Sequence, residues 1–199
     1  MDKMTHLVIH TTDTPFGRKV SADDIYMWHL GAKRIERRMA IFMGKTLPQA
    51  ELKKHKLKLP SGKIVTANET NGRGWKQVGY SDMINVDGEL INLVPYTFDD
   101  VVDSFEITNG ATGYNRNSRH VVLAGGWAKD GNKTGKKPNG QLYEIVELYS
   151  AKQIHKLVEY INMQKEIVPT LKVIGHNEIA NKTCPNFDVQ LFLKKFNRY

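Results

Sequence analysis

The sequence predicts an α/β protein with a mixed central β-sheet flanked by helices. Short apolar runs that are typical of buried strands alternate with helical segments, and no internal repeat breaks this order. With 199 residues, 40% of them hydrophobic, the chain is long enough for one domain with a sizeable core. We expect a single domain over 1–199 with one long basic insertion at about 33–74.

In the N-terminal half, the apolar run 7–9 predicts a buried strand ending at His10. Ser21 and Asp24 form a capping-box pattern, which predicts a helix that continues to about Met43. The turn residues 60–62 favour a hairpin inside the insertion. A second hairpin is predicted over 80–94, around an Asp-Gly turn.

In the C-terminal half, apolar strands are predicted at 120–124 and 171–175, with a polar loop at 129–140 between them. Ser150 and Gln153 form a capping box that begins a long amphipathic helix. We expect Asp188 to cap a last short helix. The residues of that helix expected to face inward are Leu191, Phe192 and Phe196.

The net charge of +8 is concentrated in one segment. Nine Lys and Arg against two Glu between Lys33 and Lys58 give this segment +7. Such a field attracts an anionic envelope polymer, nucleic acid or a polymerase complex, although a solvated surface would explain it equally well.

Composition also excludes some classes of protein. No run of eighteen apolar residues is present, so we expect no transmembrane segment. The first residues lack the features of a secretory signal, which favours synthesis in the cytoplasm. Cys184 is the one cysteine, so no intramolecular disulfide can form.

Three side chains in the sequence could together bind a metal ion. His10 and His176 each follow an apolar strand, and Cys184 comes eight residues after His176. Two imidazoles and one thiolate suit Zn²⁺ and leave a fourth position open. The spacing alone is weak evidence, because buried histidines and an inert buried cysteine are common.

Several short segments match one family in family order. They are Val8-Ile9-His10-Thr11-Thr12, Trp28-His29, Val78-Gly79-Tyr80, Gly113-Tyr114-Asn115-Arg116-Asn117-Ser118, Leu123-Ala124-Gly125-Gly126, Gly175-His176-Asn177-Glu178 and Lys182-Thr183-Cys184-Pro185-Asn186-Phe187-Asp188. The chain resembles the type-2 N-acetylmuramoyl-L-alanine amidases, a family that includes peptidoglycan recognition proteins and phage lysozyme-amidases. The resemblance covers everything except the basic insertion.

The resemblance implies roles for five residues. His10, His176 and Cys184 would hold Zn²⁺, Tyr80 would assist proton transfer or orient the water, and Lys182 would stabilise the oxyanion. Each role has a structural alternative. The two histidines could be core residues and Cys184 a buried thiol, Tyr80 could pack on the sheet as a strand aromatic, and Lys182 could be a solvated loop lysine.

Other positions carry no catalytic prediction. We assign Trp28 and His29 to packing. The histidines that match no family role are expected to be surface or structural residues: His6, His55, His120 and His155. Some phage relatives carry a histidine where this chain has Gly110, so any role of that histidine is absent here.

The resemblance therefore implies a zinc-dependent amidase that cuts between N-acetylmuramic acid and L-alanine in peptidoglycan. The favoured form is a phage endolysin that acts as a monomer. It would pass from the host cytoplasm to the periplasm and act as an antimicrobial by degrading the cell wall. The alternatives are a non-catalytic peptidoglycan-binding protein and a polymerase-regulating member of the family. Since the non-catalytic members usually lose the cysteine ligand, Cys184 argues against the first alternative.

Overall fold

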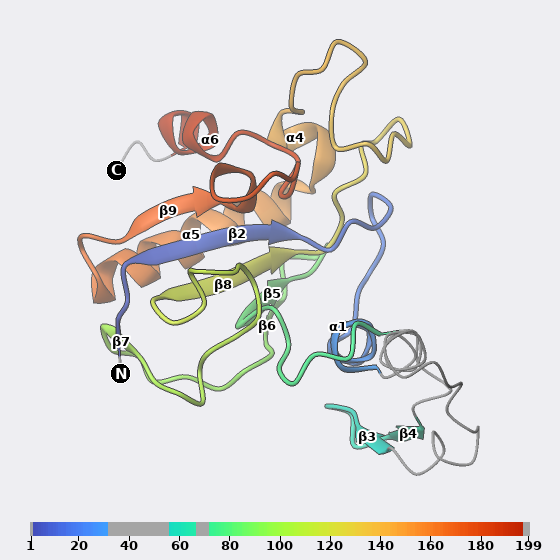
Figure 1. Ribbon diagram of the computed structural model, residues 1–199. Helices are drawn as coiled ribbons and strands as arrows, with labels where there is room; N and C mark the ends of the chain where they lie inside the picture. Colours follow the sequence, from blue (N-terminus) through green and yellow to red (C-terminus); the bar gives the residue numbers. More distant parts are fainter. Residues whose placement is uncertain (1, 32–55, 67–71, 197–199) are drawn as a thin grey trace. The chain divides into compact units, whose positions relative to one another are not determined.

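The computed structural model describes residues 2–31, 56–66 and 72–196 (Figure 1). The chain divides into two compact units, one formed by Met1–Lys19 with Gly79–Tyr199 and the other by Val20–Val78. The expectation of a single domain over 1–199 stays a prediction.

The larger unit is built on a five-stranded sheet with the order β6-β5-β8-β2-β9. Its strands are β2 (His6–Thr11), β5 (Asp82–Ile84), β6 (Leu90–Asn92), β8 (Ser118–Leu123) and β9 (Lys172–Gly175). β2 is parallel to both β8 and β9, and β5 is parallel to β8. Only the β5–β6 hairpin of this sheet is antiparallel, so the predicted mixed sheet is confirmed.

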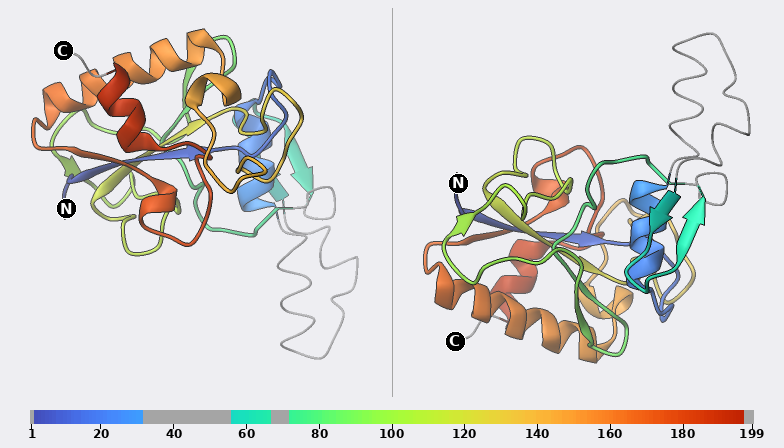
Figure 2. Two further views of the ribbon diagram at one scale, coloured as in Figure 1. Left: turned by 90° about the horizontal axis from the view of Figure 1, so that it is seen from above. Right: turned by 90° about the horizontal axis from the view of Figure 1, so that it is seen from below.

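The central strands β2 and β8 are buried on both faces, as is usual for parallel strands. Alternation along β2 directs Leu7 and Ile9 into the main core, on the side of the long helix α5 (Ala151–Ile167). Figure 2 shows α5 running along one face of the sheet. His10 has the opposite parity from these two core residues and therefore points to the other face.

The helices begin where their caps predict. Ser150 accepts from the backbone N–H of Gln153 in a complete capping box, which starts α5. The Asp188 carboxylate accepts from the N–H of Leu191 at 2.9 Å, at the start of α6 (Val189–Phe196). A short helix, α4 (Ile145–Leu148), precedes α5 and was not predicted.

One inward-facing prediction for α6 was wrong. Phe192 is buried and Phe196 packs against the core, but the Leu191 side chain is 44% exposed. In an eight-residue helix only one narrow stripe meets the sheet, and Leu191 lies outside it.

The smaller unit contains α1 (Ala22–Leu30) and a hairpin of β3 (Lys56–Lys58) and β4 (Ile64–Thr66). Both the Ser21 capping box and the hairpin around 60–62 are confirmed. The predicted extension of the helix to Met43 is wrong for α1, which ends at Leu30 because Gly31 leaves the helical conformation with φ −59° and ψ 137°. Most of the basic insertion lies outside the described residues.

A further two-stranded sheet pairs β1 (Asp2–Lys3) with β7 (Val101–Val102). Within the described ranges, no helix combines the length and apolarity needed to cross a membrane.

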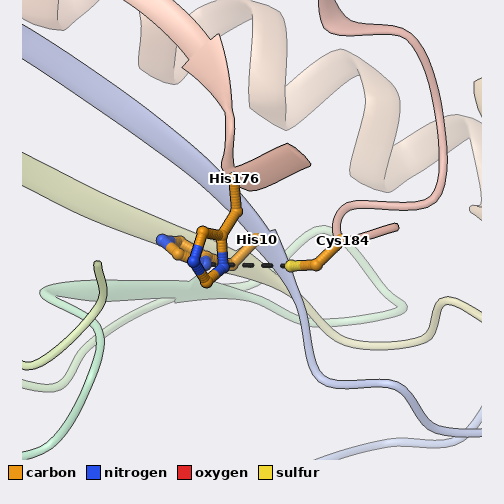
Figure 3. A group of neighbouring side chains, drawn as sticks. All are labelled: His10, His176 and Cys184. Atoms are coloured by element: carbon orange, nitrogen blue, oxygen red, sulfur yellow. Dashed lines mark hydrogen bonds between the residues drawn. The ribbon is translucent and has the colours of Figure 1, made fainter. Parts of the chain in front are cut away.

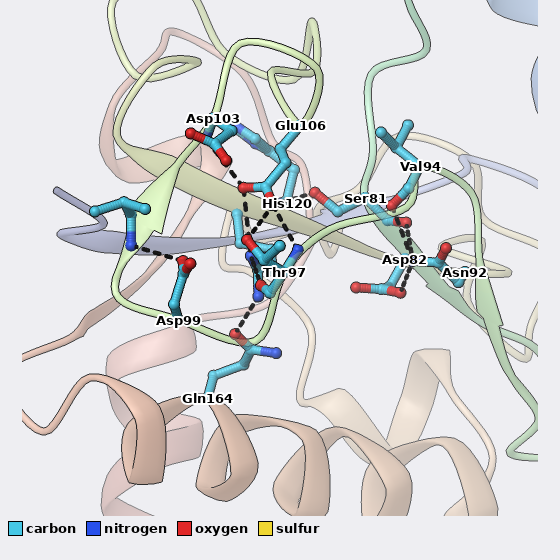
Figure 4. A network of polar contacts seen from close by, with 12 residues as sticks. Ser81, Asp82, Asn92, Val94, Thr97, Asp99, Asp103, Glu106, His120 and Gln164 are labelled. Carbon is cyan, nitrogen blue, oxygen red and sulfur yellow. Dashed lines mark hydrogen bonds and ion pairs between the residues drawn. The ribbon is translucent and has the colours of Figure 1, made fainter. Parts of the chain in front are cut away.

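A network of polar contacts links the loop between β6 and β8 to strand β8 and helix α5 (Figure 4). Arg119 of β8 donates to the Gln164 side chain at 3.1 Å and lies 3.9 Å from Glu106. Glu106 accepts from the N–H and hydroxyl of Thr97 at 2.6 and 2.8 Å, and from the N–H of Asp103 at 3.1 Å. One carboxylate thus satisfies three donors and faces a buried guanidinium.

We expect Glu106→Ala to lower the free energy of unfolding by about 3–5 kcal/mol, because it leaves the Arg119 charge buried without its partner. Urea unfolding would measure this loss. Glu159→Ala is the control, since Glu159 is exposed and pairs only at the surface with His155 and Lys156; it should cost less than about 1 kcal/mol. Equal losses in the two variants would contradict the proposed importance of the buried network.

Candidate functional site

Two histidines meet where neighbouring parallel strands end. β2 and β9 are in register with Ile9 opposite Gly175. The next residues along the chain, His10 and His176, therefore lie at the same edge of the sheet, with ring centroids 4.6 Å apart. In open α/β sheets, sites form at this carboxyl edge.

Cys184 reaches this edge on the loop that follows the short helix η2 (His176–Glu178). The N–H of Asn177 donates to the carbonyl of Cys184 at 2.7 Å, which folds the loop back over the strand end. The N–H of Thr11 donates to Cys184 Sγ at 3.3 Å. Sγ lies 3.8 Å from Nδ1 of His10, as Figure 3 shows.

These three side chains fit a zinc ion. One donor atom from each of His10, His176 and Cys184 can be chosen so that all lie within 4.8 Å of one another. With zinc bonds of about 2.0–2.3 Å, tetrahedral donors stand roughly 3.3–3.7 Å apart, so small side-chain rotations would bring the set to bonding geometry. The N/N/S donor set suits zinc and disfavours hard cations.

Burial prepares the two kinds of donor differently. Desolvation, followed by the charge of Lys182, lowers the pKa of His176 to about 4, so its imidazole is neutral and keeps a lone pair. Desolvation raises the pKa of the Cys184 thiol to about 12. The thiol must therefore lose its proton when a metal binds, and binding should release that proton.

The two residues expected to act on a substrate border the cluster. The Tyr80 ring lies 5.1 Å from the His10 ring between centroids. Tyr80 sits in the loop before β5, not within a strand as expected. Lys182 is exposed, and its positive charge contributes to the lowered pKa of His176 and offsets part of the rise in the pKa of Cys184.

Sequence reasoning missed one neighbour of the cluster, His120 of β8. Its Nδ1 lies 2.9 Å from Nε2 of His10, and the residue is fully buried. Desolvation, with a further contribution from His176, lowers the pKa of His120 to about 3. Strand parity could have found it, because His10 and His120 project from the same face of two adjacent parallel strands.

His29 belongs to the smaller unit and stacks on Trp75 with ring centroids 4.8 Å apart. Burial, followed by the charge of Arg73, lowers its pKa to about 4. This geometry agrees with the packing role assigned to His29.

Comparison with known proteins identifies distant relatives. No protein-family model matches the chain. The endolysin of Enterobacteria phage K11 is 26% identical over 122 residues, which cover 61% of this chain and 68% of the relative. The endolysin of Escherichia phage T7 is 28% identical over 123 residues, which cover 62% and 68%.

Solved structures agree in fold. The N-acetylmuramoyl-L-alanine amidase LysC of Clostridium intestinale matches with a TM-score of 0.53 at 14% identity, over 98% of this chain and 87% of that chain. A mutant of Drosophila PGRP-LB in complex with tracheal cytotoxin matches with a TM-score of 0.50 at 16% identity, over 96% and 81%. The chain has the fold of type-2 amidases and peptidoglycan recognition proteins. It is also a distant homologue of the T7 and K11 endolysins.

For this amidase fold we expect Cys184→Ala to abolish zinc binding, because it removes the only anionic donor of the cluster. Metal analysis of the wild-type protein should give about one zinc per chain. Zinc should also raise the wild-type unfolding temperature and leave that of the variant unchanged. His155→Ala, which removes an exposed histidine far from the cluster, is the control. A Cys184→Ala protein that keeps its zinc would exclude this ligand set.

Proposed function

We propose that the chain is a zinc-dependent amidase that hydrolyses the amide between N-acetylmuramic acid and L-alanine in peptidoglycan. The observation that carries the proposal is the cluster of His10, His176 and Cys184 at the carboxyl edge of an amidase-type sheet. The homology to two phage endolysins supports the same reaction and favours a role in host lysis.

When bound, zinc would supply Lewis acidity to the amide carbonyl and to the attacking water. The chain's own residues would hold the metal donors in place and stabilise the charges that develop during the reaction. Negative charge grows on the carbonyl oxygen as the amide is attacked, and we assign its stabilisation to the Lys182 ammonium, whose charge already acts on His176.

The leaving amine is a poor leaving group and must receive a proton. Tyr80 borders His10 and carries a hydroxyl that can donate and accept hydrogen bonds. We assign it the task of orienting the water or passing a proton to the departing nitrogen.

The partner in this proposal is a muropeptide of the cell wall. The complex of Drosophila PGRP-LB with tracheal cytotoxin gives a precedent for a ligand on this fold. As an endolysin, the protein would act as a monomer after release from the host cytoplasm. Any contact of the basic insertion with an anionic polymer, nucleic acid or polymerase belongs to residues that are mostly outside the described part.

The test is release of L-alanine amino groups from purified peptidoglycan. The proposal expects new amines that disappear with a chelator and return with zinc. Zinc-loaded protein that binds peptidoglycan and releases no amines would identify a non-catalytic binding protein instead.

Lys182→Ala should keep zinc and lower kcat by about 10²–10³, the usual effect of losing one oxyanion donor. Zinc content and amine release would be measured on the same preparation. Lys152→Ala is the matched control, because Lys152 is an exposed lysine on α5, across the sheet from the cluster. Full activity of the Lys182 variant would rule out its oxyanion role.

A further inference from the structure

His120 contacts the candidate zinc ligand His10 from the neighbouring strand. β2 and β8 pair with Val8 opposite His120, so His120 lies diagonally across from His10 on the same face. The two rings approach at 2.9 Å between Nε2 of His10 and Nδ1 of His120. His10 directs its other nitrogen, Nδ1, towards Cys184 Sγ at 3.8 Å.

This hydrogen bond can have either of two proton arrangements. If His120 donates, His10 carries its proton on Nδ1, which faces the cluster and could not bind a metal. If His10 donates from Nε2, its Nδ1 keeps a free lone pair directed at the cluster. Only the second arrangement makes His10 a ligand, and it requires His120 to accept through Nδ1.

We infer that His120 is a positioning residue that accepts the Nε2 proton of His10 and so fixes the ring and tautomer that a metal ion needs. Metal-binding histidines commonly use their second nitrogen in this way, with a carboxylate or carbonyl as partner. In this chain a second imidazole occupies that place. The inference rests on the proposed zinc site, and its test separates the two.

The other nitrogen of His120 argues against a purely structural role. Nε2 is buried and makes no hydrogen bond to any of the described residues. A buried polar atom without a partner destabilises a fold, so an apolar side chain would serve packing alone better. The contact with His10 is the polar interaction that accounts for an imidazole side chain here.

Gly110 makes room for this ring. A Cβ at position 110 would lie 2.2 Å from Nδ1 of His120 and 2.5 Å from its Cγ, and also 2.7 Å from the carbonyl oxygen of Gly79. Any side chain at 110 would therefore push the His120 ring away from its present position. Gly110 and His120 form a matched pair, and Gly110→Ala should weaken the contact with His10 while leaving His120 in the sequence.

The experiment compares wild type, His120→Leu and His120→Asn. Leucine fills the space without an acceptor, whereas the asparagine Oδ1 can stand where Nδ1 stood. Zinc affinity would be measured by chelator competition, and the visible spectrum of the Co²⁺ form would report ligand geometry. Urea unfolding of the metal-free proteins would report the structural effect separately.

We expect His120→Leu to weaken zinc binding by about 10–100-fold and to change the Co²⁺ spectrum, with His120→Asn closer to wild type in both. In the zinc-loaded wild type, ¹⁵N-histidine NMR should show the His10 proton on Nε2 and none on Nδ1 of His120.

Unchanged zinc affinity and Co²⁺ spectrum in His120→Leu would overturn the inference and leave the zinc site intact. The inference would also be overturned if His120→Leu lost as much stability in its metal-free form as it lost in zinc affinity and His120→Asn restored neither. If His120→Leu fails to fold, Gly110→Ala with the same NMR measurement decides the question. A wild-type protein that binds neither zinc nor Co²⁺ would instead refute the proposed function.

Discussion

The site depends on the parallel register between β2 and its two neighbours. Because β9 pairs with β2 so that Gly175 stands opposite Ile9, the next residue of each chain segment, His10 or His176, lies at the same level of the sheet edge. The register with β8 places His120 beside them. A slip of one residue in either pairing would turn a ring to the opposite face of the sheet and separate the donors.

The two faces of the sheet have different tasks. One face carries Leu7 and Ile9 into an apolar core with α5, and the buried network around Arg119 and Glu106 lies beneath the same helix. This packing fixes the strands. The other face carries the imidazoles, so the core sets the precision with which the donors meet.

Enclosure also determines the chemistry of the donors. Burial lowers the pKa of His176 and His120 and raises that of the Cys184 thiol, so these three side chains are neutral at pH 7 in the metal-free protein. A divalent cation that displaces the proton of Cys184 would offset the energetic cost of burying the resulting thiolate. The loop carrying Cys184 is held by the backbone bond from Asn177, which places the thiol before any metal is present.

The sequence by itself determined the strand that carries His10, the strand that precedes His176, the capped helices α1, α5 and α6, and the donor types that suit zinc. Periodicity, capping and ligand chemistry are local properties. The tertiary structure alone showed that His120 joins His10 and His176. His120 looked structural because the strand pairing that places it 2.9 Å from His10 joins residues 110 positions apart. The exposure of Leu191 was likewise set by which surface of α6 has a packing partner, and no local pattern encodes that.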